Sequence, residues 1–120
     1  MATVTAALTL TSTTATSDDL KLSVSSNLTT VEPSVGISRI SLVGDAAATT
    51  IFADNTTTTY VYLKNMDSTN HIKWFNDTDD GMGILWPGEF ALFAVIDAEG
   101  LKVQANTGNC ILEYAYWTKG

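Results

Sequence analysis

Few residues of this chain carry groups that could do covalent or metal chemistry. The chain has one histidine, His71, and one cysteine, Cys110. A nucleophilic serine or cysteine needs a base beside it, and a zinc site needs several His or Cys ligands. His71 has no nucleophile motif around it, and Cys110 sits in an apolar strand pattern that predicts a buried thiol. We therefore expect no catalytic residues, no metal site and no cofactor, and we interpret the protein as a non-enzyme.

The acidic segment at residues 76–81 is the nearest approach to a cation-binding loop. It reads Asn-Asp-Thr-Asp-Asp-Gly, and closely spaced side-chain oxygens followed by glycine can wrap a calcium ion. The spacing of an EF-hand would put Thr78 at the third ligand position, and there is no Glu at the twelfth. We interpret the segment as an acidic turn.

Aromatic side chains could form a platform for a sugar, because their rings stack on the apolar faces of pyranoses. Trp74, Trp86 and Tyr116 are the candidate ligand-facing residues. Alternation along the last strand places Tyr114 and Tyr116 on one face and Trp117 on the other, so part of the aromatic set must be core. A glycan-binding or receptor-binding module therefore stays open as an alternative.

The elements that must position these side chains are all predicted strands. Leu8 and Leu10 alternate with threonines, and Leu20, Leu22 and Val24 alternate with polar residues, which is the period of a strand with one wet face. Further strands are predicted at residues 37–43, 49–52, 60–64, 72–75, 90–96, 101–105 and 110–117. The sequence predicts an all-β fold: an antiparallel β-sandwich of eight or nine short strands, for which a jelly roll is one arrangement.

The last three predicted strands are joined by turn sequences and are expected to form an antiparallel meander. Pro87-Gly88 suits a type II turn, because proline fixes φ at the first corner and glycine accepts a positive φ at the second. Residues 97–100 and 106–109 are expected to form the next two turns.

Charge and length narrow the classes of partner. The chain has 120 residues, with 13 acidic and 6 basic side chains and a net charge of -7, which disfavours binding to nucleic acid or to anionic lipid. The N-terminus lacks the basic region of a signal peptide, and no apolar run approaches the roughly 18 residues of a membrane span. We expect no nucleic-acid or membrane partner, and synthesis in the cytoplasm.

The N-terminal part of the chain is rich in Thr and Ser and poor in apolar residues. Residues 11–19 and 25–36 contain too little apolar material to lie in a core and are predicted to be loops or an extended arm. We assign residues 1–19 to an N-terminal strand and arm, and residues 20–120 to the β-sandwich domain. Such an arm could add a strand to the edge of a neighbouring sheet, whereas the alternative is a plain surface loop.

A resemblance covers residues 60–117. The sequences Tyr-Val-Tyr-Leu-Lys-Asn at 60–65, Ile-Lys-Trp at 72–74, Leu-Trp-Pro-Gly-Glu-Phe at 85–90 and the closing Glu113-Tyr114 look like the turn outline of small β-sandwich structural proteins of tailed bacteriophages. The resemblance implies a virion structural protein. The roles it suggests are capsid decoration (a cement protein), a head fibre, or a neck or tail component.

Capsid decoration is the leading hypothesis among these. The resemblance then implies a location on the surface of the capsid, binding to the major capsid protein or another virion protein, and a homotrimer, because threefold positions on a shell offer each copy the same site. The residues predicted to attach the arm to the shell are Thr3, Val4, Thr5, Leu8 and Leu10. The neck, tail or head-fibre role and the glycan-binding or receptor-binding module remain the alternatives.

Overall fold

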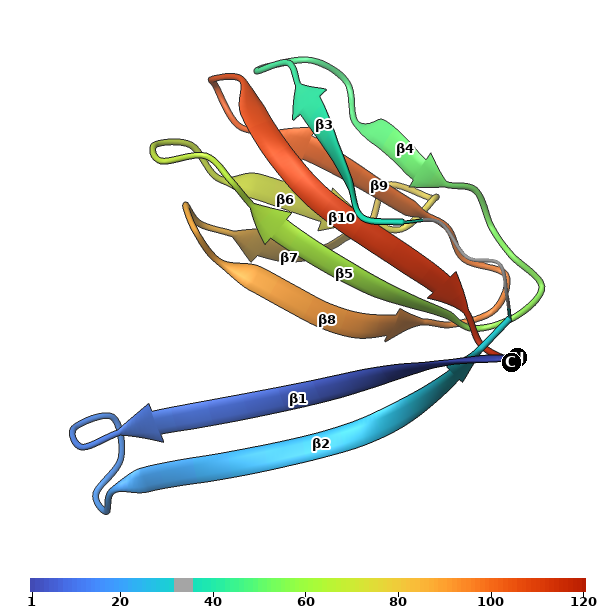
Figure 1. Ribbon diagram of the computed structural model, residues 1–120. Coiled ribbons are helices and arrows are strands. Elements are labelled where there is room, and N and C mark those ends of the chain that lie inside the picture. Colours follow the sequence, from blue (N-terminus) through green and yellow to red (C-terminus); the bar gives the residue numbers. More distant parts are fainter. Residues whose placement is uncertain (32–35) are drawn as a thin grey trace. The chain divides into compact units, whose positions relative to one another are not determined.

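The computed structural model describes residues 1–31 and 36–120. Its described part consists of ten antiparallel strands and contains no helix, and therefore none that is long and apolar enough to cross a membrane (Figure 1). The prediction of an all-β antiparallel fold is confirmed, with one or two strands more than expected. The strands are β1 Ala2–Ser12, β2 Leu20–Thr30, β3 Ser38–Leu42, β4 Thr49–Phe52, β5 Thr59–Asn65, β6 Ile72–Phe75, β7 Gly81–Leu85, β8 Phe90–Val95, β9 Leu101–Ala105 and β10 Cys110–Thr118.

The chain divides into two compact units. One comprises residues 1–33 together with Gly120, and the other comprises residues 34–119. The boundary predicted at residues 19 and 20 therefore moves, because β2 pairs along its whole length with β1 and belongs to the first unit. Of the loop predicted at 25–36, residues 25–30 lie in β2, and residues 32–35 fall outside the described residues.

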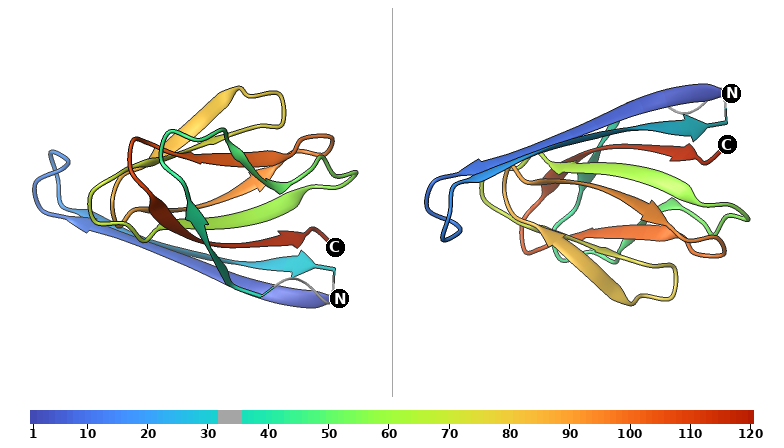
Figure 2. Two further views of the ribbon diagram at one scale, coloured as in Figure 1. Left: turned by 90° about the horizontal axis from the view of Figure 1, so that it is seen from above. Right: turned by 90° about the horizontal axis from the view of Figure 1, so that it is seen from below.

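The first unit is one long β-hairpin. β1 and β2 are each eleven residues long, and their register runs without a shift from Ala2 opposite Thr30 to Ser12 opposite Leu20. Both views in Figure 2 show the two strands side by side along their length. At the turn, the Ser12 hydroxyl accepts hydrogen bonds from the amides of Thr14 and Ala15 at 3.1 and 3.0 Å.

The second unit is an eight-stranded jelly roll. Its two four-stranded sheets have the orders β3-β10-β5-β8 and β4-β9-β6-β7. Strands that follow one another in sequence lie in different sheets, except β6 and β7, which form a hairpin within the second sheet. This double-sheet arrangement is a jelly roll, which is one of the sandwich arrangements that the sequence predicts.

The meander predicted for the last three strands is wrong. β8 pairs with β5, β9 pairs with β4 and β6, and β10 pairs with β3 and β5, so each connection crosses from one sheet to the other. Period-two patterning shows which side of a strand is buried but carries no information about its neighbour, and both sheets bury one face. The Pro87-Gly88 turn is confirmed: Gly88 has φ of +80°, and the Glu89 amide donates to the Trp86 carbonyl at 3.0 Å.

Strand β7 was not predicted because it begins Gly-Met-Gly, and glycine weakens a strand pattern. Its Gly83 lies opposite Trp74 of β6. A Cβ at Gly83 would come within 2.2 Å of the Trp74 ring. The glycine is needed here because the large indole occupies the space where a side chain would be.

The core fills the space between the two sheets of the jelly roll. The predicted burial of Cys110 is confirmed at 1% exposure, and this burial raises the pKa of its thiol. The polar side chains of Thr59 and Asn65 in β5 are also buried, and the Asn65 amide nitrogen donates to the carbonyls of Asn70 and Leu85. The apolar core residues are Leu42, Val61, Leu63, Ile72, Leu85, Val95, Leu101, Val103, Ala105, Cys110 and Leu112.

Candidate attachment surface

One face of the hairpin is entirely polar apart from a single alanine. Thr3 lies opposite Thr29, Thr9 opposite Ser23, and Thr11 opposite Lys21. Between the two strands, the Thr5 hydroxyl donates to the amide oxygen of Asn27 at 3.0 Å. Alternate residues of a strand point to opposite faces, so the apolar residues of both strands gather on the other side.

That other face is mainly apolar, and the half of it nearer the turn is exposed. Leu8 lies opposite Val24, and Leu10 opposite Leu22. The exposed fractions of these four side chains range from 39% for Leu8 and Leu22 to 50% for Val24. We call Leu8, Leu10, Leu22 and Val24 the hairpin patch.

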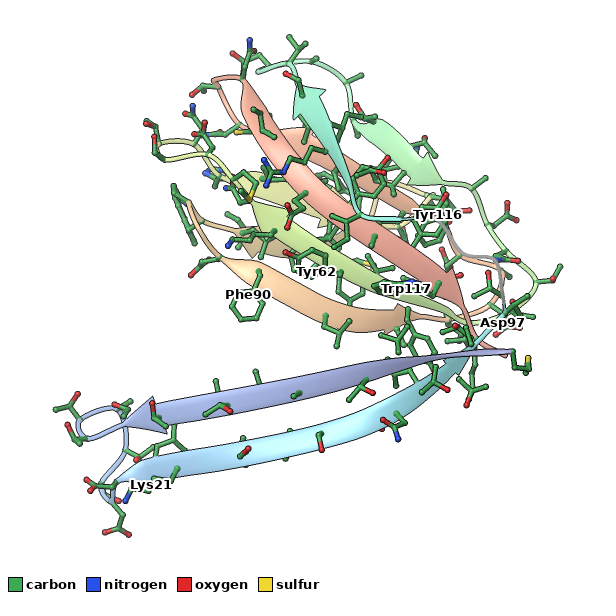
Figure 3. The ribbon with its side chains drawn as sticks, viewed as in Figure 1. Lys21, Tyr62, Phe90, Asp97, Tyr116 and Trp117 are labelled. Carbon is green, nitrogen blue, oxygen red and sulfur yellow. The ribbon has the colours of Figure 1, made fainter. Side chains whose placement is uncertain are left out.

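The outer edges of the hairpin have little of the usual protection against pairing with another strand, although the Gly120 amide donates to the Thr29 carbonyl of β2 at 2.9 Å. Among the described strands, β1 and β2 pair only with each other. Natural edge strands are commonly blocked by Lys, Pro, bulges or inward-pointing charges. β1 and β2 contain no proline and no register shift, and their one charged residue is Lys21, close to the turn (Figure 3).

The predicted attachment residues are divided between the two faces. Thr3 and Thr5 lie on the polar face, whereas Val4, Leu8 and Leu10 lie on the apolar face. Sequence reasoning missed Leu22 and Val24, since it assigned their strand to the sandwich. The sequence signal for a hairpin was that apolar and polar residues alternate in the same way in both strands, which have equal length.

A second apolar surface lies on the outer side of the β3-β10-β5-β8 sheet. Phe90 and Leu92 of β8 are 62% and 49% exposed, and Ile111 of β10 is 48% exposed; Figure 3 labels Phe90 on β8. Outward positions of a sandwich are usually polar. This face therefore also has the character of a contact surface.

A small polar network lies on the same outer side. The Tyr62 hydroxyl donates to Glu113 Oε1 at 2.8 Å, and Arg39 Nε and Nη2 each lie 3.0 Å from Glu113 Oε2. Partial burial, followed by the bond to Glu113, raises the pKa of Tyr62 to about 12. The bond from Tyr62, followed by that from Arg39, lowers the pKa of Glu113. The network is a fixed structural link between three strands and offers no group poised for proton transfer near neutral pH.

The three candidate ligand-facing aromatics pack on different partners. Trp74 stacks on Phe93 with ring centres 5.3 Å apart, and the ring centres of Tyr116 and Phe52 are 5.0 Å apart. Trp74 and Tyr116 both pack against the core. Trp86 is 53% exposed, and the centre of its ring lies 4.7 Å from the centre of the His71 ring. The predicted division of the last strand holds, because Tyr114 and Tyr116 pack inward.

The acidic segment at 76–81 uses its oxygens within the turn. Asn76 Oδ1 accepts bonds from the amides of Thr78 and Asp80 at 3.1 and 2.8 Å, and Asp79 pairs with Lys102 at 3.0 Å. The interaction between the carboxyl groups of Asp77 and Glu99 lowers the pKa of Asp77 and raises that of Glu99. Across residues 1–31 and 36–120, no group of three or more His, Cys, Asp or Glu side chains is arranged to hold a metal ion.

Comparison with known proteins gives no relative. No protein-family model, no curated protein and no solved structure matches the chain.

Proposed function

We propose that this protein is a capsid decoration protein of a tailed bacteriophage, a homotrimer that attaches to the outer shell through its N-terminal hairpin. The observation that carries the proposal is the regular and largely unprotected edge of an eleven-residue hairpin. Exposed edges of this length are normally blocked in proteins that act alone. A protein that keeps one is suited to pairing with another chain.

The jelly roll is compatible with this role. Jelly rolls occur in viral capsid domains as well as in lectins and cupins, although a fold does not by itself imply a function. The apolar core between the two sheets gives a stable body to display on a particle.

Strand addition is the proposed mode of attachment. An edge of β1 or β2 would continue a sheet of the major capsid protein, so that backbone hydrogen bonds supply affinity and alternate side chains supply specificity. The neutral Thr and Ser side chains of the polar face can hydrogen-bond to the shell without a charge to desolvate. Many identical shell sites would then be filled by identical hairpins.

Copy number tests the place of the protein on the particle. Quantitative mass spectrometry of purified particles would give the number of chains per major capsid subunit. A number on the order of hundreds per particle agrees with shell decoration, whereas about a dozen indicates a neck or tail component. Absence from particles contradicts any virion role.

Edge pairing is tested by placing lysines on the strands. The double variant Thr9→Lys, Ser25→Lys puts a positive charge on each edge strand, and the control Thr13→Lys, Thr16→Lys adds the same charge in the turn. We expect the strand variant to bind stripped capsids at least about tenfold more weakly than the control, a loss of about 1.4 kcal/mol. Equal binding of the two variants would remove strand addition from the proposal.

The glycan-binding alternative is favoured by one observation, the exposure of Trp86 at the Pro87-Gly88 corner. An exposed indole on a rigid turn could stack on a sugar ring. Binding to a glycan array that is lost in Trp86→Ala and kept in Trp86→Phe would support this function. Absence of glycan binding by the wild-type protein would eliminate it.

A further inference from the structure

The hairpin has an apolar face that a two-stranded sheet cannot cover by itself. An isolated hairpin is marginally stable in water, and a sheet needs further strands or a packed layer over its apolar face to be stable. All four residues of the hairpin patch remain at least 39% exposed. Something outside the two strands must therefore cover this face for the hairpin to be well ordered.

Charge favours another copy of the same chain as the cover. The whole chain has a net charge of -7. The only charged side chains in residues 1–31 are those of Asp18, Asp19 and Lys21, all at or beside the turn. Two copies of an acidic protein repel each other least where they are uncharged. The apolar face of β1 and β2 is such a region, because its side chains are aliphatic or small and carry no charge.

The shape of the face also suits self-association. The two strands pair without a bulge. On this face, two apolar cross-strand pairs are neighbours: Leu8 with Val24, and Leu10 with Leu22. Two such ribbons can stack face to face about 10 Å apart, with branched side chains interdigitating as they do between the sheets of a sandwich. Stacking through the faces leaves the edges accessible.

We infer that the apolar face of the hairpin, centred on Leu8, Leu10, Leu22 and Val24, is the self-association surface of this protein and is covered by the same face of another copy. The same face on both copies makes a twofold contact between two chains, so this inference goes beyond the proposed function and is separate from the threefold arrangement proposed on the shell. It concerns the purified chain and does not require the virion role. The edges of β1 and β2 would then stay available for a different partner.

A pair of matched variants tests the inference. Leu8→Asp with Val24→Asp places two charges on opposed residues of the apolar face, and Thr9→Asp with Ser23→Asp does the same on the polar face one position away. Sedimentation equilibrium of the full-length proteins would give their association constants. We expect the wild type and the polar-face control to associate alike, and the apolar-face variant to associate at least about tenfold more weakly or to remain monomeric.

Folding of the variants is checked independently. All three tryptophans, Trp74, Trp86 and Trp117, belong to the unit at residues 34–119, so their fluorescence reports the jelly roll and not the hairpin. A milder pair, Leu8→Ala with Val24→Ala, removes apolar area without adding charge. It should weaken association in the same direction, by less than the aspartate pair.

Amide hydrogen exchange separates this inference from its rivals. If copies cover each other, protection of residues 2–30 in the wild type rises with protein concentration and falls in the apolar-face variant. A wild type that is monomeric throughout, with protection independent of concentration, overturns the inference in favour of packing within one chain. Equal association of both aspartate variants also overturns it. Loss of capsid binding with association intact would affect only the proposed virion role.

Discussion

The Tyr62 hydroxyl donates a hydrogen bond of 2.8 Å to Glu113 Oε1 and so ties β5 to the neighbouring β10. Arg39 binds the other carboxylate oxygen from β3. The carboxylate is thus stabilised in its charged form from both sides, which is why its pKa is lowered. Three strands of one sheet are joined through a single side chain.

This link predicts a loss of stability in acid. A carboxyl group with a lowered pKa in the folded state stabilises the fold above its unfolded pKa, here about 4.5, and that contribution disappears as the pH falls through the folded value. We expect the urea midpoint of the wild type to fall between pH 5 and about pH 3, and that of Glu113→Gln to fall less. The exposed carboxylate variant Asp97→Asn serves as control and should follow the wild type. A Glu113→Gln profile parallel to that of the wild type would contradict this prediction.

Gly83 is predicted to tolerate no side chain. Adding a methyl group in Gly83→Ala would push the Trp74 indole off its stacking partner Phe93, because the new Cβ would lie 2.2 Å from the ring. Overpacking of this kind costs about 1–3 kcal/mol of the free energy of unfolding. Chemical denaturation followed by tryptophan fluorescence measures the change.

Gly81 supplies the control in the same strand. A Cβ there would meet only the Phe75 ring, at 3.8 Å, which is an ordinary contact. Gly81→Ala should therefore not lower the free energy of unfolding, and the better fit of alanine to a strand raises it by up to about 1 kcal/mol. Equal destabilisation by the two alanines would show that the packing of Trp74 is not the cause.

Ala98 is predicted to be a site where glycine stabilises the protein. Its φ of 67° lies in the left-handed region, which costs a residue with a Cβ roughly 1–2 kcal/mol. Ala98→Gly relieves that cost and keeps the bond from its amide to the Asn55 carbonyl. After the entropy cost of glycine in the unfolded chain, we expect a net gain of up to about 1 kcal/mol, seen as a higher melting temperature.

The opposite result is expected within a strand. Ala94→Gly removes the same methyl group in β8, where the backbone is extended. Glycine in a strand lowers the free energy of unfolding by about 0.5–1 kcal/mol relative to alanine. If both variants melted below the wild type, the strain assigned to Ala98 would be refuted.

The turn at residues 97–100 illustrates what the sequence could not specify locally. Glycine predicts a positive φ, yet at this turn the positive φ belongs to Ala98, while Gly100 is buried where a Cβ would lie 2.8 Å from the Phe52 carbonyl. Gly100 is required because the neighbouring backbone of Phe52 leaves no room for a side chain, and not because the turn needs a positive φ there. At Pro87-Gly88 the turn itself requires it, and there the sequence prediction is confirmed.

The sequence alone determined the properties that depend on one strand or one turn. Alternation of apolar and polar residues identified nine of the ten strands approximately, the burial of Cys110 and the inward side of β10, because a strand with one buried face must alternate. The tertiary structure decided which strands are neighbours. The crossing of β8, β9 and β10 between two sheets and the pairing of β2 with β1 are long-range choices. Such choices depend on how all the buried faces pack together, and a periodic pattern in one segment does not encode its partner.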